Sequence, residues 1–202
     1  MKTCPPANVP LSLGPNGVML DEFSPVREKG DFVLALGRIC PEKGFHLALD
    51  AAKRASATLL LAGTVFPYPE HMRYFRNEIV PRLDDRRLFI GAIGRRQKKD
   101  LLARARCVLL PSFVEETSSL VAMESLASGT PVIARKVGAL GDLLEEGITG
   151  YFASSAEEMA DAIDRVSTMS SGSCRRVAEQ RFSSRAMTAA YVELFGRLAA
   201  CA

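Results

Sequence analysis

The sequence has few residues of the kinds that bind metals or form disulfide bridges. It contains two histidines, and its five cysteines are scattered without C-x-x-C spacing. This pattern argues against a disulfide scaffold or a zinc site and fits a reducing cytoplasm, where we expect the protein to reside. Neither His46 nor His71 has a cysteine or an acid at metal-ligand spacing, so we predict structural or surface roles for both. Cys107 lies in the apolar run RCVLLPS and is expected to be buried.

Long apolar runs and a large charge imbalance are also absent. No stretch of about 18 or more apolar residues occurs, so the sequence predicts no membrane span. The N-terminal residues lack the apolar core of a signal peptide, and peripheral contact with the inner membrane face stays open. The net charge of +3 is too small to indicate nucleic-acid binding. We interpret the basic stretches 82–87 and 94–100 as solvated faces.

What remains is an ordinary globular composition, with 48% hydrophobic and 24% charged residues. Residues 1–30 are rich in proline, glycine and asparagine, and we interpret them as a linker leading into one domain at 31–202. In that domain, short continuous apolar runs alternate with segments of helical spacing. Such runs are typical of strands buried on both faces of a parallel sheet. We therefore predict a doubly wound, Rossmann-like α/β fold.

The positions of the expected elements follow from this alternation. In the first expected helix, Phe45, Leu49 and Ala52 share one face, and Ser155 is expected to cap the sixth. Ligands of such sheets bind at the carboxyl ends of the strands, which makes the strand-to-helix loops the candidate site. We expect strands at 31–37, 57–63, 87–93, 106–112, 130–135 and 150–153, and helices at 44–55, 70–83, 96–105, 118–128, 139–147, 155–169 and from 175 onward.

The first candidate loop is GRICPEKG, residues 37–44, which follows the first expected strand. Arg38 and Lys43 flank a tight turn that contains a proline. Two cations beside a strand end can clamp a polyphosphate, the arginine as a planar fork and the lysine as a point charge. Two ordinary surface cations are the alternative, and this stretch alone does not decide between them.

The second candidate loop, PSFVEETSS, precedes the expected helix 118–128. Thr117, Ser118 or Ser119 can cap that helix, and the free N–H groups of a helix start attract anions by about 0.3–1 kcal/mol per charge. Simple capping is the alternative to phosphate binding, and the two can coexist.

Two acids, Glu116 and Glu124, flank the start of this otherwise apolar helix. Glu124 shares a helical stripe with Leu120, Met123 and Ala127, so it interrupts the apolar side. A buried carboxylate is costly unless it is paired or hydrogen-bonded. The spacing fits two interpretations equally well: the acids contact different parts of one elongated ligand, or Glu116 is a solvated loop acid and Glu124 forms a buried ion pair.

The third candidate loop, RKVGALGD, follows the strand PVIA. Gly138 and Gly141 allow close backbone approach. Asp142 is expected to cap a helix or to reach toward a bound sugar, and a flexible turn without a ligand is the alternative.

With these residues in view, the chain resembles the C-terminal, donor-binding domain of the group 1 (family 4) retaining glycosyltransferases, which have the GT-B fold. Five motifs match in order over roughly residues 13–195: GPNGVMLDEFSP, GRICPEKG, the strand pair LLLAG and RLFIGAI, PSFVEETSSLVAMESLASGTPVIA, and GALGDLLEEGITGYF. The third of these carries no polar site residue, whereas the fourth places Glu116 and Glu124 in the two acidic positions of the family's E-x7-E region.

The resemblance implies a role for each candidate residue. Arg38 and Lys43 would hold the donor diphosphate, Glu124 would bind the ribose hydroxyls, and Glu116 would face the donor sugar as the catalytic residue. Gly91 would lie beside the base. The diphosphate would also be capped at the helix start by Ser118, Ser119 and the backbone of Leu120 and Val121. The substrate would be a nucleoside-diphosphate sugar, and we expect no cofactor and no metal, because the sequence has no Asp-x-Asp motif.

This sequence departs from the family in three places. Thr117-Ser118-Ser119 stands where a Gly-Phe-Gly-like run is common, and Asp142 stands where a glutamate is usual. The acceptor-binding N-terminal domain of a GT-B enzyme is expected to be absent from this chain, and the C-terminal segment resembles the one that crosses back toward it. The alternatives are a donor-binding subunit that works with a separate acceptor chain, and an inactive nucleotide-sugar-binding module. A dinucleotide-binding oxidoreductase ranks far below, since G-x-G-x-x-G is absent.

Overall fold

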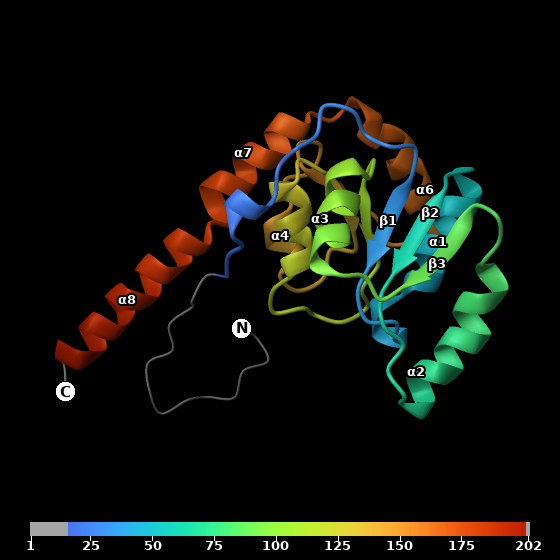
Figure 1. Ribbon diagram of the computed structural model, residues 1–202, viewed down its shortest axis with the longest axis horizontal. Coiled ribbons are helices and arrows are strands. Elements are labelled where there is room, and N and C mark those ends of the chain that lie inside the picture. Colours follow the sequence, from blue (N-terminus) through green and yellow to red (C-terminus); the bar gives the residue numbers. More distant parts are fainter. Residues whose placement is uncertain (1–15, 201–202) are drawn as a thin grey trace.

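The computed structural model describes residues 16–200 and centres on one parallel sheet (Figure 1). Its order is β3-β2-β1-β4-β5-β6. The order runs outward in one direction from β1 and in the other from β4, so strand order reverses between these two strands. The strands are β1 Val33–Leu36, β2 Leu59–Ala62, β3 Arg87–Gly91, β4 Val108–Leu110, β5 Val132–Ala134 and β6 Gly150–Phe152.

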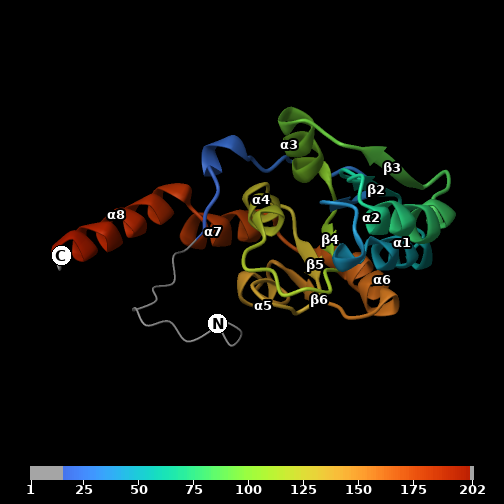
Figure 2. The same ribbon diagram turned by 90° about the horizontal axis from the view of Figure 1, so that it is seen from below.

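Helices cover both faces of this sheet, as Figure 2 shows from below. The helices are α1 Phe45–Arg54, α2 Pro69–Tyr74, α3 Arg95–Arg104, α4 Leu120–Ala127, α5 Leu140–Leu143, α6 Ala156–Arg165, α7 Ser171–Arg181 and α8 Ser184–Ala200. Val33 and Ala35 of β1 pack in one core with α1 and α6. Leu34, between them, packs in a second core with α3, α4 and α7. A strand buried on both faces has no polar alternation, and the predicted doubly wound, Rossmann-like fold is confirmed.

Most expected elements are present, and their ends differ by a few residues; α7, for example, begins at Ser171 and not at residue 175. Phe45, Leu49 and Ala52 are buried together as predicted, and Cys107 is fully buried. Ser155 caps α6, because its hydroxyl accepts a hydrogen bond from the Glu158 N–H. The terminal cysteines Cys4 and Cys201, and residues 1–15 of the expected linker, lie outside the described residues.

Several expected helices differ from the structure. The helix expected at 155–169 is α6 only to Arg165, followed by a 3-10 turn at Val166–Thr168. The helix expected at 70–83 is α2 only to Tyr74, followed by a π-helical segment at Phe75–Ile79 and a 3-10 turn at Val80–Arg82. Pro81 in that turn cannot donate a helical hydrogen bond, which explains the early end of regular structure. The helix expected at 118–128 begins at Leu120. The helix expected at 139–147 is the short α5, and Gly147 lies in the turn beyond it.

Residues 16–30 pack along the domain. Val18 pairs with Ser183 in a parallel bridge, and Val18 and Phe23 are buried. Arg175 of α7 holds this segment, because its guanidinium donates to the carbonyl groups of Leu20 and Phe23 and also to that of Ala127 at the end of α4. One side chain thus joins three segments that are distant in sequence.

We expect Arg175→Ala to lower the free energy of unfolding by roughly 1–3 kcal/mol, because three partly buried carbonyl groups lose their donor. Urea titration followed by circular dichroism measures this. Arg176 is the matched control, since it is the neighbouring arginine of α7 and is exposed. Equal losses for Arg175→Ala and Arg176→Ala would contradict the anchoring role.

Helix α8 extends away from the sheet and its layers (Figures 1 and 2). None of its residues is buried, and Tyr191, Val192, Phe195 and Leu198 are exposed. No helix in the described range 16–200 combines the length and the apolar character that crossing a membrane requires.

Candidate functional site

A cavity of about 190 Å³ lies at the carboxyl ends of β1 and β4, where the strand order reverses. The loops after these two strands supply most of its polar wall. Two cations, an acid and the start of α4 meet there. Its lining includes Gly37, Arg38, Lys43, Glu116, Ser119 and Val121.

The turn after β1 is held close to the loop after β4. Pro41–Lys43 form one 3-10 turn that ends at Gly44 with φ +64°. A Cβ added at Gly44 would lie 2.5 Å from the carbonyl oxygen of Pro111, so glycine is needed both for the left-handed backbone and for the contact. The Phe113 N–H donates to the carbonyl oxygen of Glu42 at 2.8 Å. The loop after β4 therefore carries Glu116 back to Lys43.

Lys43 and Glu116 form an ion pair inside this cavity. The Lys43 Nζ lies 2.6 Å from a carboxylate oxygen of Glu116, and both side chains are largely buried. The alternative interpretation of Glu116 as a solvated loop acid is therefore wrong. Arg38 is exposed, and among residues 16–200 no carboxylate lies within ion-pair distance of it. The guanidinium of Arg38 is thus free to bind an added anion.

The glycine-rich turn after β5 packs against the backbone of Glu116. The Ala139 N–H donates to the carbonyl oxygen of Glu116 at 2.8 Å. A Cβ at Gly138, where φ is +50°, would lie 2.6 Å from that oxygen. Close approach is thus confirmed at Gly138 but not at Gly141, whose added Cβ would make only ordinary contact. Asp142 does not cap a helix as expected, because it lies inside α5 and Ala139 takes the cap position.

The start of α4 faces the cavity with unpaired polar groups. Ser119 takes the cap position, but its hydroxyl caps no N–H group, so the expected side-chain capping is wrong. Among the described residues no acceptor is found for the N–H groups of Leu120 and Val121. The Ser118 hydroxyl oxygen is buried without a partner in the same range. These donors are available to an anion at the helix start.

Glu124 lies in a second cavity beside the first and is paired with a lysine. The Lys98 Nζ of α3 lies 2.6 Å from its carboxylate, and both side chains are largely buried. The cavity has a volume of about 750 Å³ and is also lined by Gly94 and Leu120. On the helical stripe, Met123 and Ala127 are buried as expected, whereas Leu120 is half exposed.

Lys98 is a site residue that the sequence did not reveal. The stretch 94–100 was interpreted as a solvated face, which holds for Arg96 but not for Lys98. The other basic stretch, 82–87, also contains one buried member, Arg87, which is paired with Asp84. Lysine is frequent on surfaces, and only the spatial neighbour Glu124 distinguishes Lys98 from its neighbours in the sequence.

Gly91 is set apart from the other candidate residues. It ends β3 with φ +72°, and nothing lies within 4 Å of the place a Cβ would take. It lines neither of the two cavities. The structure therefore brings together Arg38, Lys43, Glu116, Ser119 and Val121, places Glu124 and Leu120 next to them, and leaves Gly91 outside the lining of both cavities.

His71 has partners that its sequence neighbours did not indicate. Its ring, the Cys40 thiol and the Glu42 carboxylate have ligand atoms within 4.8 Å of one another. Burial, with a hydrogen bond to Glu42, raises the pKa of the Cys40 thiol to about 11. The sequence spacing around His71 did not indicate these partners, because Cys40 and Glu42 belong to a distant segment of the chain. His46, in contrast, contacts the Tyr74 hydroxyl at 3.0 Å and has a structural role.

Comparison with known proteins agrees with this architecture. Residues 20–183 match the profile of the family described as Glycosyl transferases group 1. The chain is 31% identical over 137 residues to Lipopolysaccharide 1,2-N-acetylglucosaminetransferase of Salmonella typhimurium, covering 62% of this chain and 35% of that protein. It is 30% identical over 171 residues to D-inositol 3-phosphate glycosyltransferase of Mycobacterium bovis, covering 81% and 35%.

Solved structures resemble the chain as well. Sucrose-phosphate synthase from Thermosynechococcus elongatus superposes with a TM-score of 0.84 and 27% identity, over 95% of this chain and 53% of that one. Anabaena HepE in complex with UDP and glucose gives a TM-score of 0.77 over 90% and 55%, and its 22% identity supports the fold alone. The chain spans about a third of the length of the two curated relatives and about half of these structures. The chain belongs to the group 1 glycosyl transferases, and its fold is the donor-binding half of a GT-B enzyme.

Proposed function

We propose that this domain binds a nucleoside-diphosphate sugar and presents it for transfer, with retention, to an acceptor held by another domain or chain. The observation that carries the proposal is the cavity between β1 and β4, where Arg38, Lys43, Glu116 and the start of α4 converge. Cations and free N–H groups around one small space suit a diphosphate, whose negative charge grows as the glycosidic bond breaks. Homologous HepE has been solved with UDP and with UDP-glucose, which supports a donor of this class.

We assign each site residue to one part of the donor. Arg38 and Lys43 bind the diphosphate, together with Ser118, Ser119 and the backbone N–H groups of Leu120 and Val121. Glu116 faces the donor sugar and Glu124 binds the ribose hydroxyls. Each carboxylate already has a lysine at 2.6 Å, so Arg38 is left, among the described site residues, as the unpaired positive charge that a diphosphate can meet. We place Gly91 beside the base, because the open space at its Cβ position leaves room for a ring.

The acceptor site is proposed to lie outside residues 16–200. We propose that the chain functions with an N-terminal GT-B acceptor domain or a separate acceptor chain, and that α8 contacts it. The exposed apolar side chains of α8, which include Val192 and Phe195, give that helix a surface to bury. Residues 1–30 are proposed as the segment that links the two halves.

Calorimetric titration of the purified chain with UDP, GDP and ADP and their sugar conjugates tests the proposal. We expect saturable binding of one nucleotide. Glu124→Ala should weaken it about 10–150-fold, because charged hydrogen bonds contribute roughly 1.5–3 kcal/mol. Glu115→Ala is the control, since Glu115 is an exposed acid of the same loop as Glu116. A folded chain that binds none of these nucleotides contradicts the proposal for the isolated domain.

A donor-binding module without catalysis is a second candidate, and the pairing of both acids with lysines favours it. In that case Glu116 serves only to hold Lys43. The two candidates differ in the contact of Glu116 with the sugar, so Glu116→Gln should lower the preference for the sugar conjugate over the free diphosphate only if Glu116 faces the sugar.

A further inference from the structure

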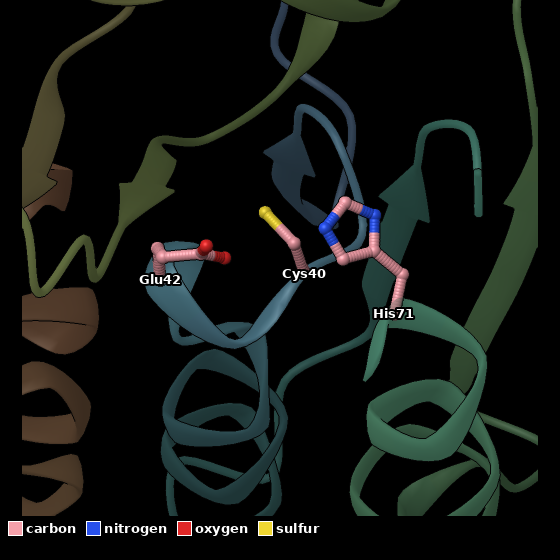
Figure 3. Close-up of side chains that lie close together, drawn as sticks. All are labelled: Cys40, Glu42 and His71. Carbon is pink, nitrogen blue, oxygen red and sulfur yellow. The ribbon is translucent and has the colours of Figure 1, made fainter. Parts of the chain in front are cut away.

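Outside the proposed donor site, three side chains of metal-binding type converge on one small space. Cys40 precedes the 3-10 turn Pro41–Lys43, Glu42 lies within it, and His71 lies in α2. Their ligand atoms lie within 4.8 Å of one another. Figure 3 shows the His71 ring and the Glu42 carboxylate both directed toward Cys40, from two different segments of the chain.

The separations suit a tetrahedral metal ion after small side-chain rotations. With metal–ligand bonds of about 2.0–2.3 Å, ligand atoms around Zn²⁺ lie roughly 3.3–3.8 Å apart. The present limit of 4.8 Å exceeds this range by about 1–1.5 Å, so the side chains must rotate to close around an ion. A thiolate, an imidazole and a carboxylate also form a ligand set that favours zinc over magnesium or calcium, which prefer oxygen ligands.

The protein itself leaves the His71 ring unsatisfied. Its Nδ1 atom is buried, and no hydrogen bond to the ring is found within residues 16–200. The Tyr68 ring packs edge-on against it at a centroid distance of 5.1 Å and supplies no polar partner. Cys40 is 2% exposed, and the polar neighbours of its thiol are the Arg38 carbonyl oxygen, at 3.6 Å, and the Glu42 carboxylate. The other ring nitrogen of His71, Nε2, is the one directed toward Cys40 in Figure 3, and it is likewise without a hydrogen-bond partner in the described range, so it is available to bind an ion.

We propose that Cys40, Glu42 and His71 bind one zinc ion, with a water molecule in the fourth position. The thiol loses its proton on binding, so thiolate and carboxylate together neutralise the charge of the ion. The ion joins α2 to the turn that carries Arg38 and Lys43. Its role there is structural, and it takes no part in sugar transfer.

The bound zinc ion is expected to affect binding of the donor. Arg38 and Lys43 flank Cys40 and Glu42 in the sequence, so fixing these two ligands limits the movement of both cations. Pre-ordered groups lose less entropy on binding, and zinc is expected to tighten nucleotide binding. This consequence rests on the proposed function, whereas the metal site itself does not.

Titration of the metal-free chain with Co²⁺, followed by displacement with Zn²⁺, tests the site without any nucleotide. We expect one equivalent of Co²⁺ to give thiolate-to-metal charge-transfer absorption and tetrahedral visible bands. Competition with a chromogenic chelator should give a Zn²⁺ dissociation constant below about 1 μM. Cys40→Ala should abolish the charge-transfer band, and His71→Ala should weaken Zn²⁺ binding at least ~100-fold.

Matched controls are available within the chain. Cys174→Ala removes another buried thiol and should keep the band. Glu70→Gln, beside His71 but exposed, should bind Zn²⁺ like the parent, whereas Glu42→Gln should not. The proposal is overturned if the folded parent chain binds no metal, or if Cys40→Ala keeps the band. Zinc binding without nucleotide binding would leave the metal site standing and remove the proposed function.

Discussion

Gly138→Ala is expected to weaken nucleotide-sugar binding by about 100-fold, whereas Gly147→Ala leaves it nearly unchanged. Both glycines have a left-handed backbone, with φ of +50° and +79°. An alanine there costs roughly 1–2 kcal/mol at either position. Only at Gly138 does the new Cβ also meet protein atoms, because it would lie 2.6–2.8 Å from backbone atoms of Glu115 and Glu116. The loop that carries Glu116 must then move, and the loss of one charged hydrogen bond to the donor weakens binding by about 10–150-fold.

Comparing these two variants separates the effect of backbone strain, which both share, from the effect of moving the loop that carries Glu116. Calorimetric titration with the preferred nucleotide sugar gives the affinity, and thermal unfolding gives the stability of each variant. Both variants should lose stability through the left-handed strain, and Gly138→Ala should lose more because its loop must also move. Only Gly138→Ala should lose affinity, because the space around Gly147 is open. If both variants bind the donor equally well, the support of Glu116 by the turn after β5 has no part in donor binding.

The fold was predictable because its signals are local. Continuous apolar runs such as 57–63 report burial on both faces, and the spacing of Phe45, Leu49 and Ala52 reports one buried helix face. The irregular end of α2 was not predicted, since apolar spacing continues through Pro81 while the backbone hydrogen bonding does not. The ends of helices and strands depend on such local backbone hydrogen bonding, which the spacing of apolar residues alone does not predict.

The site was predictable only in part because its contacts are distant in sequence. The loops with Arg38, Lys43 and Glu116 were found from their positions after strands, and the structure brings these residues into one cavity. Lys98 was missed, since nothing in its own stretch indicates that α3 places it against Glu124. His71 was missed for the same reason, because its partners Cys40 and Glu42 belong to another segment.

Lys43→Met is expected to weaken binding of the free nucleoside diphosphate by about 10–150-fold. The change removes one cation that we assign to the diphosphate, and charged hydrogen bonds contribute roughly 1.5–3 kcal/mol. It also leaves the largely buried Glu116 carboxylate without its partner at 2.6 Å, so that an anion entering the cavity meets an unpaired negative charge. Lys53→Met, at an exposed lysine of α1, changes the net charge equally and should bind the nucleotide like the parent.

In the same titration, Glu116→Gln should have the opposite effect on binding of the free nucleoside diphosphate. Without the carboxylate, Lys43 no longer divides its charge between Glu116 and the diphosphate, so binding of the free diphosphate should be kept or strengthened. Binding of the sugar conjugate should fall relative to it, because the carboxylate that we propose to face the sugar is lost. The opposite effects follow if, as we propose, Lys43 of this ion pair binds the diphosphate and Glu116 binds the sugar. A parallel weakening of diphosphate binding in both variants would mean that the pair only holds the two loops together.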